Sequence, residues 1–231
     1  MRIRKKTAKL WGLLLVIAIL STVVGPGVQA AETYSGVSYC NSLYNNAAFQ
    51  DISGHWAQPA IYRAVALGII RGEGNKFRPN AVVSKEDALG MLIRLANLEE
   101  AAQRMGVDPT VEVGHLNPWG ANYAALAQSL GIITADERQR TNWQQAATRE
   151  EVAYWMARTL NLLPVYGQAQ QAIYGFNDWK QFTKSRMPYC EAIIGAKIMN
   201  GSTSNTFNPQ QAIKRGELAA VLDKASQLYL P

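Results

Sequence analysis

The sequence has 231 residues, 48% of them apolar and 17% charged, and a formal net charge of +6. Residues 1–30 contain five of the 23 basic residues and none of the 17 acidic ones, which leaves 18 basic against 17 acidic groups in the rest. A nearly neutral chain does not have the overall positive charge of a nucleic-acid-binding protein. We therefore expect no nucleic-acid partner, and any basic site must be local.

The chain begins with a segment typical of secretion. The basic stretch MRIRKK precedes the apolar stretch LWGLLLVIAILSTVV, and Val28 and Ala30 suit a cleavage site. We expect residues 1–30 to be a signal peptide and residues 31–48 a short N-terminal segment. An uncleaved anchor is the alternative, although the apolar stretch falls short of the ~20 residues that a membrane span needs. The cleaved chain is thus expected to be secreted, with no membrane span.

Cysteine and histidine are scarce. Cys40 and Cys190 fit an oxidising or non-cytosolic compartment, and they could form a disulfide or remain separate thiols. His55 and His115 do not have the spacing of metal ligands. We therefore expect no metal and no cofactor.

The rest of the sequence repeats itself. The stretch ALGIIRG reappears as SLGIITA and, more loosely, as GAKIMNG, while VSKEDAL matches ATREEVA and IKRGELA. Apolar residues after each of the latter recur at the intervals of a helix face. Each repeat is predicted to contain two helices joined by a polar loop, and the prolines Pro59 and Pro188 suit the first turn of a first helix. The repeats cover residues 49–98, 112–162 and 174–229.

The second helix of each repeat is predicted to begin with a capping signal. Ser84 with Asp87, and Thr148 with Glu151, have the spacing of a capping box, in which the two side chains bond the free amides of the first turn. We expect capping to be the main role of these four residues. The third repeat has Lys214 where the hydroxyl residue would stand.

A basic residue follows the cap in every repeat: Lys85, Arg149 and Arg215. The positive end of the helix dipole disfavours a cation there by roughly 0.3–1 kcal/mol. An anion bound to free N–H groups at the helix start would remove this penalty. We hypothesise that the three cations hold a ligand carboxylate; the alternative is that they pair with acidic neighbours across repeat boundaries. The basic residues nine positions further on are expected to be solvated: Arg94, Arg158 and Lys224.

The repeat resembles the S-layer homology repeat. The resemblance rests on Phe49 and Asp51 ahead of His55-Trp56-Ala57, on Gly68-Ile69-Ile70 with Gly72, and on Phe77 with Pro79. The family signature Thr-Arg-Ala-Glu reads Ser84-Lys85-Glu86-Asp87, Thr148-Arg149-Glu150-Glu151 and Lys214-Arg215-Gly216-Glu217. The second repeat departs from the pattern, with Gly114 at the position of Asp51. In the third, two extra residues put Trp179 out of register, and Ser185 takes the position of Trp56.

The resemblance implies an all-α fold, a pseudo-threefold bundle of three helix-loop-helix repeats with grooves between neighbouring prongs. It also implies non-covalent anchoring of an exported protein to the bacterial cell wall or cell surface. The ligand would be a secondary cell-wall polysaccharide, which often carries a pyruvate ketal whose carboxylate suits an arginine fork. The implied partner is this polysaccharide, and another surface protein is the alternative partner if the chain acts as an adaptor.

Further candidate ligand contacts have structural alternatives. Trp56 and Trp119 could stack on a sugar face or pack between prongs. Gly72 and Gly74 could let backbone amides approach a ligand, or could form a turn that needs positive φ. Asp51 could contact the ligand, but we expect it rather to cap the segment at His55.

No catalytic pattern is present: the sequence contains no HExxH, P-loop, GxSxG or CxxC. We therefore expect a binding protein and no enzyme. The alternatives are a structural subunit that self-assembles into a surface layer, an adaptor for another exported protein, and a regulatory subunit of an exported enzyme.

Overall fold

The computed structural model describes residues 49–107, 115–167 and 171–229, and these residues belong to one compact unit. The expected signal peptide, the segment 31–48 and Cys40 lie outside the described residues. The described part is all-α, as predicted, and it contains only isolated β-bridges in place of strands. No helix in these ranges is both long enough and apolar enough to cross a membrane.

Each repeat contributes two longer helices. They are α3 (Gln58–Ala66), α4 (Lys85–Leu95), α6 (Pro118–Ser129), α8 (Arg149–Thr159), α10 (Met187–Gly195) and α11 (Arg215–Tyr229). The shorter elements are α5 (Glu99–Gln103), α7 (Ala135–Arg140), α9 (Gln171–Tyr174) and the 3₁₀-helix η2 (Trp179–Gln181). As predicted, a proline lies in the first turn of α3 and of α10. The second repeat has the same feature, because α6 begins at Pro118.

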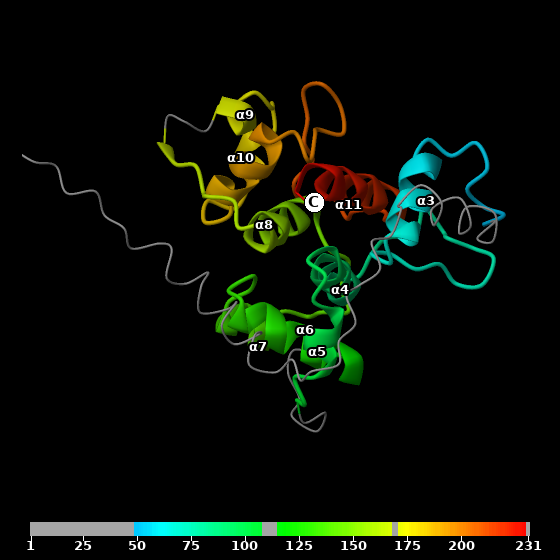
Figure 1. Ribbon diagram of the computed structural model, residues 1–231. Helices are drawn as coiled ribbons and strands as arrows, with labels where there is room; N and C mark the ends of the chain where they lie inside the picture. Colours follow the sequence, from blue (N-terminus) through cyan, green and yellow to red (C-terminus); the bar gives the residue numbers. More distant parts are fainter. Residues whose placement is uncertain (1–48, 108–114, 168–170, 230–231) are drawn as a thin grey trace, which may run out of the picture. The chain divides into compact units, whose positions relative to one another are not determined.

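Every first helix packs against the second helix of a different repeat. Helix α6 packs on α4, α10 packs on α8, and α3 packs on α11, so the first long helix of the described chain lies against the last. Figure 1 shows α4, α8 and α11 in the middle of this unit, with α3, α6 and α10 outside them. The expected bundle of helix pairs is therefore present, and each pair combines two repeats.

Three backbone hydrogen bonds join the segments that precede the second helices. Val83 N donates to Ile213 O at 3.1 Å, Ile213 N donates to Ala147 O at 2.9 Å, and Ala147 N donates to Val83 O at 2.8 Å. All three side chains are buried. Each residue precedes one of the basic residues by two positions. The closed ring of hydrogen bonds therefore brings the three helix starts together.

Two buried glutamates connect successive repeats. Glu86, in the first turn of α4, accepts hydrogen bonds from the backbone and side-chain amides of Asn117, both at 2.8 Å. Glu150, in the first turn of α8, accepts from Thr183 N at 2.8 Å and from Arg186 Nη1 at 3.1 Å. Burying a carboxylate is costly unless it is hydrogen-bonded. These bonds offset that cost and fix the chain that leads into α6 and α10.

Two stretches outside the predicted helices are helical. Helix α7 lies in the polar loop of the second repeat, where Thr134 and Glu137 form a complete capping box. Helix α5 follows the first repeat, with two glutamates in its first turn. Acidic residues in the first turn stabilise a helix start, which explains why α5 and α7 are helical. The expectation of a polar loop without a helix was therefore wrong at α7.

Candidate functional site

Arg149, the first residue of α8, is held by the loop of the third repeat. Its Nε donates to Phe207 O at 2.8 Å and its Nη2 donates to Asn200 O at 2.7 Å. The guanidinium lies over the Phe207 ring, 4.9 Å from the centroid. The residue is only 5% exposed, and burial lowers the pKa of the guanidinium from its ordinary value. The two carbonyls use two of the five N–H donors.

Arg215, the first residue of α11, has the same environment in the loop of the first repeat. Its Nε donates to Phe77 O at 2.9 Å and its Nη2 donates to Arg71 O at 2.7 Å. The guanidinium lies 4.8 Å from the centroid of the Phe77 ring, and burial lowers its pKa. The ion pairs among the described residues include neither Arg149 nor Arg215. Both arginines are therefore held by neutral carbonyls rather than by carboxylates.

Lys85, at the third equivalent position, differs from the arginines. Its Nζ lies 2.8 Å from Glu151 Oε1 in the first turn of α8, and its side chain is only 14% exposed. Arg186 Nη1 lies 3.6 Å from the same carboxylate oxygen. The alternative that the cations pair with acidic neighbours across repeats thus applies to Lys85. A ligand carboxylate would have to compete with Glu151 for this lysine.

The helix starts do not offer the free amides that the anion hypothesis assumed. In α8, Arg149 N donates to Gln211 O at 2.9 Å and Glu150 N donates to Pro209 O at 3.0 Å. The first two amides of α4 and of α11 are bonded in the same way to carbonyls of another repeat. Adjacent repeats thus complete each helix start, which corrects the assumption. Any anion must bind the side chains rather than the helix ends.

The capping residues lie as the sequence indicates, with one difference. Thr148 and Glu151 form a complete capping box at α8. At α4, Asp87 N donates to Ser84 Oγ at 3.0 Å, but the Asp87 carboxylate accepts from the Ser84 hydroxyl at 2.8 Å instead of from its backbone amide. The box at α4 is therefore incomplete. In the third repeat, Lys214 N donates to the Glu217 side chain at 3.0 Å, which forms the other half of a box.

Trp56 is 66% exposed. It lines a groove of about 430 Å³, called the Trp56 groove, together with Arg149, the loop residues 200–202 and side chains of α11. Lys224 of α11 lines the groove, whereas it was expected to be simply solvated. Glu217 is the acidic residue in this lining. Two cations against one carboxylate give the groove a net positive charge.

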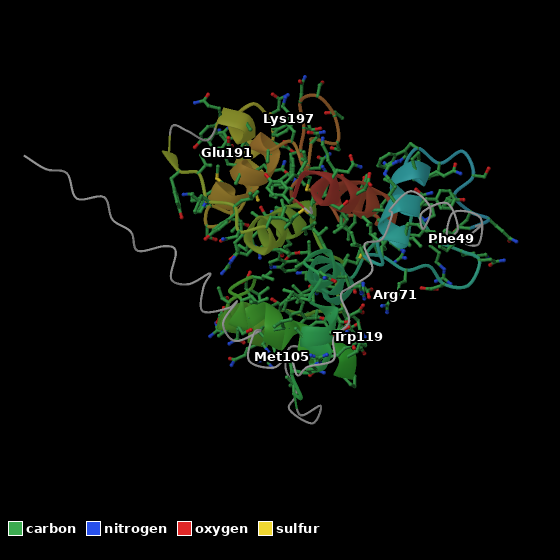
Figure 2. All side chains as sticks on the ribbon, viewed as in Figure 1. Phe49, Arg71, Met105, Trp119, Glu191 and Lys197 are labelled. Atoms are coloured by element: carbon green, nitrogen blue, oxygen red, sulfur yellow. The ribbon has the colours of Figure 1, made fainter. Side chains whose placement is uncertain are left out.

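A second groove of about 360 Å³, called the Trp119 groove, lies at the equivalent place between α4 and α6. Trp119 is 39% exposed and packs edge-on against Tyr123, with ring centroids 5.4 Å apart. Arg71 and Trp119, both of which line this groove, are labelled in Figure 2. Glu99 accepts from Arg71 at 2.8 Å and from Arg94 at 3.1 Å, so one carboxylate serves both cations.

Two of the three basic residues expected to be solvated are largely buried. Arg94 has a side chain that is 14% exposed, and Arg158 has one that is 18% exposed. Arg94 also donates to Ile69 O at 3.2 Å, and Arg158 donates to the Tyr154 hydroxyl. Their spacing on the helix suggested the far side, but the loop and the neighbouring repeat cover that side too.

The third equivalent place is filled by protein side chains. Tyr154 of α8 packs edge-on against Tyr189 of α10, with centroids 5.3 Å apart. Arg158 and Arg186 lie over the Tyr154 ring, at 5.1 and 5.6 Å from its centroid. Ser185 takes the position that tryptophan has in the other repeats. This place therefore has no exposed tryptophan, and its described cations all lie close to carboxylates.

Asp51 does not cap the segment at His55, contrary to our expectation. Its two oxygens accept from Phe77 N at 2.8 Å and from Arg78 N at 2.7 Å. Asp178 binds the equivalent amides of Phe207 and Asn208 in the third repeat. The carboxylate thus shapes the loop whose carbonyls hold the arginine of another repeat.

The two glycines of the first loop have different roles. At Gly72, an added Cβ would overlap the Phe49 ring, so the residue is needed for close packing. Gly74 has φ of +58° in open space, as a turn requires. Neither glycine lines the Trp56 or the Trp119 groove. Their ligand role stays a prediction.

Cys190 is buried and forms no disulfide within the described residues. Burial raises the pKa of this thiol well above its ordinary value, and its Sγ lies 3.7 Å from Glu150 O. Because Cys40 lies outside the described residues, a bond between the two stays a prediction. In the described ranges, no group of three or more potential ligand side chains could hold a metal ion.

The described unit is thus a helical repeat module whose grooves combine exposed tryptophan with cations. The family model for the S-layer homology domain matches residues 48–89 and 175–219. The protein therefore carries S-layer homology domains in these two regions. The matched residues leave out the second repeat, whose loop is replaced by α7.

Known proteins that resemble the chain are much longer. It is 28% identical to the exoglucanase XynX of Acetivibrio thermocellus over 78% of this chain and 16% of that protein. It is 27% identical to the amylopullulanase of Thermoanaerobacterium thermosulfurigenes, over 75% of this chain and 9% of that protein. It is also 27% identical to the S-layer protein sap of Bacillus anthracis, over 48% and 14%. The chain thus spans less than a fifth of each of these relatives.

Proposed function

We propose that the protein anchors itself non-covalently to the bacterial cell wall by binding an anionic, pyruvylated secondary cell-wall polysaccharide. The Trp56 groove is the principal binding site, and the Trp119 groove is a second, weaker one. The match to the S-layer homology domain and the likeness to an S-layer protein support a location at the cell surface. The role is binding, and the two enzyme relatives correspond to this chain over only a small part of their length.

The observation that carries the proposal is the pairing of Trp56 with Arg149 in one groove. The exposed indole offers a flat apolar face on which a pyranose ring can stack. Arg149 makes its two hydrogen bonds through Nε and Nη2, so the Nη1 side of the fork is available for a carboxylate. Because the fork is already fixed by carbonyls and by Phe207, little side-chain entropy is lost on binding.

The charges of the two grooves support the proposal that the Trp56 groove binds the polysaccharide more strongly than the Trp119 groove. In the Trp56 groove, no ion pair among the described residues includes Arg149 or Lys224. In the Trp119 groove, Glu99 already neutralises part of the charge of two arginines. A ligand anion therefore displaces no internal partner in the first groove and competes with one in the second.

Co-sedimentation with purified cell walls tests the proposal. The variants are Trp56→Ala, Trp119→Ala and, as a control, Tyr229→Ala, which removes an exposed aromatic ring at the end of α11. We expect Trp56→Ala to weaken wall binding by about tenfold, because the lost ring contact is worth up to about 1.5 kcal/mol. The control is expected to bind like the wild type. Wall binding that is equal in all variants would reject the grooves as the site.

A further inference from the structure

A third hollow, of about 570 Å³, lies outside the two grooves and is called the Tyr166 hollow. It combines aromatic side chains with lysines, and none of its ten lining residues is acidic. The lining residues that matter for the argument are Tyr166, Tyr174, Trp179, Lys180, Lys184 and Ser185. Neither groove shares a lining residue with it.

Eight of the ten lining residues of the hollow belong to the third repeat, and Tyr166 and Gly167 precede it. The third repeat also has the two extra residues after Asp178. These residues put Trp179 in η2, so the ring packs edge-on against Tyr174, with centroids 5.0 Å apart. Ser185, at the position of Trp56, lines the hollow. The repeat that lost its groove tryptophan therefore presents a tryptophan in a different place.

Hydrogen bonds that α10 accepts hold the aromatic side of the hollow in position. Val165 N donates to Pro188 O at 2.9 Å, which fixes the chain next to Tyr166. Glu191, which is buried, accepts from Ala172 N and Ile173 N, both at 2.8 Å, and so fixes the start of α9. Both aromatic segments are thus attached to one helix before any ligand binds. Such a preformed site loses little entropy on binding.

The chemistry of the hollow fits an anionic saccharide. Tyr166 is 65% exposed, and Tyr174 is also exposed, so their rings offer apolar faces with hydroxyl groups at the edge. Lys180 Nζ lies 5.7 Å from the centroid of the Trp179 ring. No ion pair of the described residues includes Lys180 or Lys184. Unpaired lysines beside exposed rings favour a ligand that has both a carbohydrate face and negative charge.

An acidic peptide fits less well. The described residues around the hollow form short helical turns and contain no strand to which an extended peptide could add. Helix α9 has only four residues, and η2 has only three. Neither forms the long apolar channel that an amphipathic peptide helix needs.

We propose that the Tyr166 hollow is an additional binding site for the same anionic wall polysaccharide, in place of the groove that the third repeat has lost. The inference rests on the proposed function for the identity of the ligand. The hollow includes Met187 and Pro188 at the start of α10, and the Trp56 groove includes Ile198 and Met199 just beyond its end. Helix α10 is about 14 Å long at 1.5 Å per residue. Figure 2 labels Glu191 within this helix and Lys197 beyond its end.

Two sites that lie near opposite ends of α10 can bind one polymer chain. Once the Trp56 groove holds the polymer, the next saccharide units are present near the hollow at a high effective concentration. Even a weak contact at the hollow then raises the affinity for the polymer.

The test compares two double variants that have the same chemistry. Tyr166→Ala/Lys184→Glu alters the hollow, while Tyr229→Ala/Arg140→Glu makes the same kind of change at exposed positions that line none of the three sites. The measured quantity is the affinity for purified wall polysaccharide, in the wild type, both double variants and Trp56→Ala. All five substituted positions are exposed and lie outside the core, and urea unfolding of each variant verifies the fold.

We expect the hollow variant to bind the polymer at least fivefold more weakly than the control variant. Equal affinity of the two double variants, together with weaker binding by Trp56→Ala, would overturn this inference and leave the proposed function intact. Weaker binding by the hollow variant with unchanged binding by Trp56→Ala would support the hollow and overturn the groove assignment. A wild type that does not bind the polymer would overturn both.

Discussion

Lys85 Nζ and Glu151 Oε1 lie 2.8 Å apart and join the start of α4 to the start of α8. The two arginines at the equivalent positions contact backbone carbonyls instead. Three positions that look alike in the sequence therefore have two different environments. One cation is neutralised within the protein, and the other two keep N–H donors for a partner.

A double-mutant cycle on this pair tests the internal role of Lys85. Removing one partner of a largely buried pair costs about 3–5 kcal/mol, and we expect the cost for Lys85→Met and for Glu151→Gln to lie near the lower end, because neither side chain is completely buried. The coupling energy from urea unfolding should be about 1–3 kcal/mol. Wall binding by a folded Lys85→Met variant should stay within twofold of the wild type. Additive effects on stability would show that the pair does not form in solution.

Replacing Arg149 by lysine separates charge from geometry. Lysine keeps the positive charge but does not reproduce the fork that reaches two carbonyls and lies on the Phe207 ring. We expect Arg149→Lys to lower the free energy of unfolding by about 1–3 kcal/mol, since the buried carbonyl of Phe207 and the partly buried carbonyl of Asn200 lose a partner. Wall binding should fall at least tenfold, when it is measured where the variant is fully folded. Arg140→Lys, at an exposed position, is the control, and both quantities should stay unchanged there.

The two loop glycines make a matched pair for a packing test. Gly72→Ala places a methyl group in the space of the Phe49 ring, and such overpacking costs about 1–3 kcal/mol. Gly74→Ala meets no atom within 4 Å and pays only for the left-handed backbone, about 1 kcal/mol. In a Phe49→Ala background, the cost of Gly72→Ala should shrink while that of Gly74→Ala should not. Urea unfolding of the six chains measures this, and an unchanged cost of Gly72→Ala in that background would argue against the contact.

Low pH should remove the contribution that the Asp51 carboxylate makes to the stability of the first-repeat loop. Burial alone would raise the pKa of this carboxyl, but the amides of Phe77 and Arg78 outweigh that effect and lower the pKa below its ordinary value. Because the folded pKa is lower than the unfolded pKa of roughly 3.9, the stabilising contribution is present above that pH and is lost as the pH falls through the folded value. The stability difference between the wild type and Asp51→Asn should therefore shrink between pH 6 and pH 2.5. A constant difference over that range, measured by urea unfolding, would contradict this role.

The all-α fold and the paired helices could be predicted from the sequence, because apolar spacing and capping signals are local. The prolines of α3 and α10 and the capping box at Thr148 are examples. The exchange of partners between repeats could not be predicted, since the hydrogen bonds between Val83, Ala147 and Ile213 join residues more than sixty positions apart. Helix α7 was missed because its polar residues have no apolar face, and its capping box was not recognised.

For the candidate site, the sequence indicated where cations and tryptophans recur but not which groups they contact. Carbonyls hold Arg149 and Arg215, and every residue has a carbonyl, so no sequence pattern marks such a contact. The partner of Lys85 is Glu151, which the sequence indicated only as a cap. Lys224 and Arg94 were not predicted to line the grooves. A basic residue recurs nine positions after the first cation of each repeat, and this recurrence was a usable signal.

The affinity for purified wall polysaccharide, measured before and after removal of the pyruvate ketal, tests most directly whether the Trp56 groove recognises negative charge. The wild type should bind the ketal-free polymer at least tenfold more weakly than the intact one, and Trp56→Ala should weaken the binding of both. Equal affinity of the wild type for the two polymers would contradict the role given to Arg149.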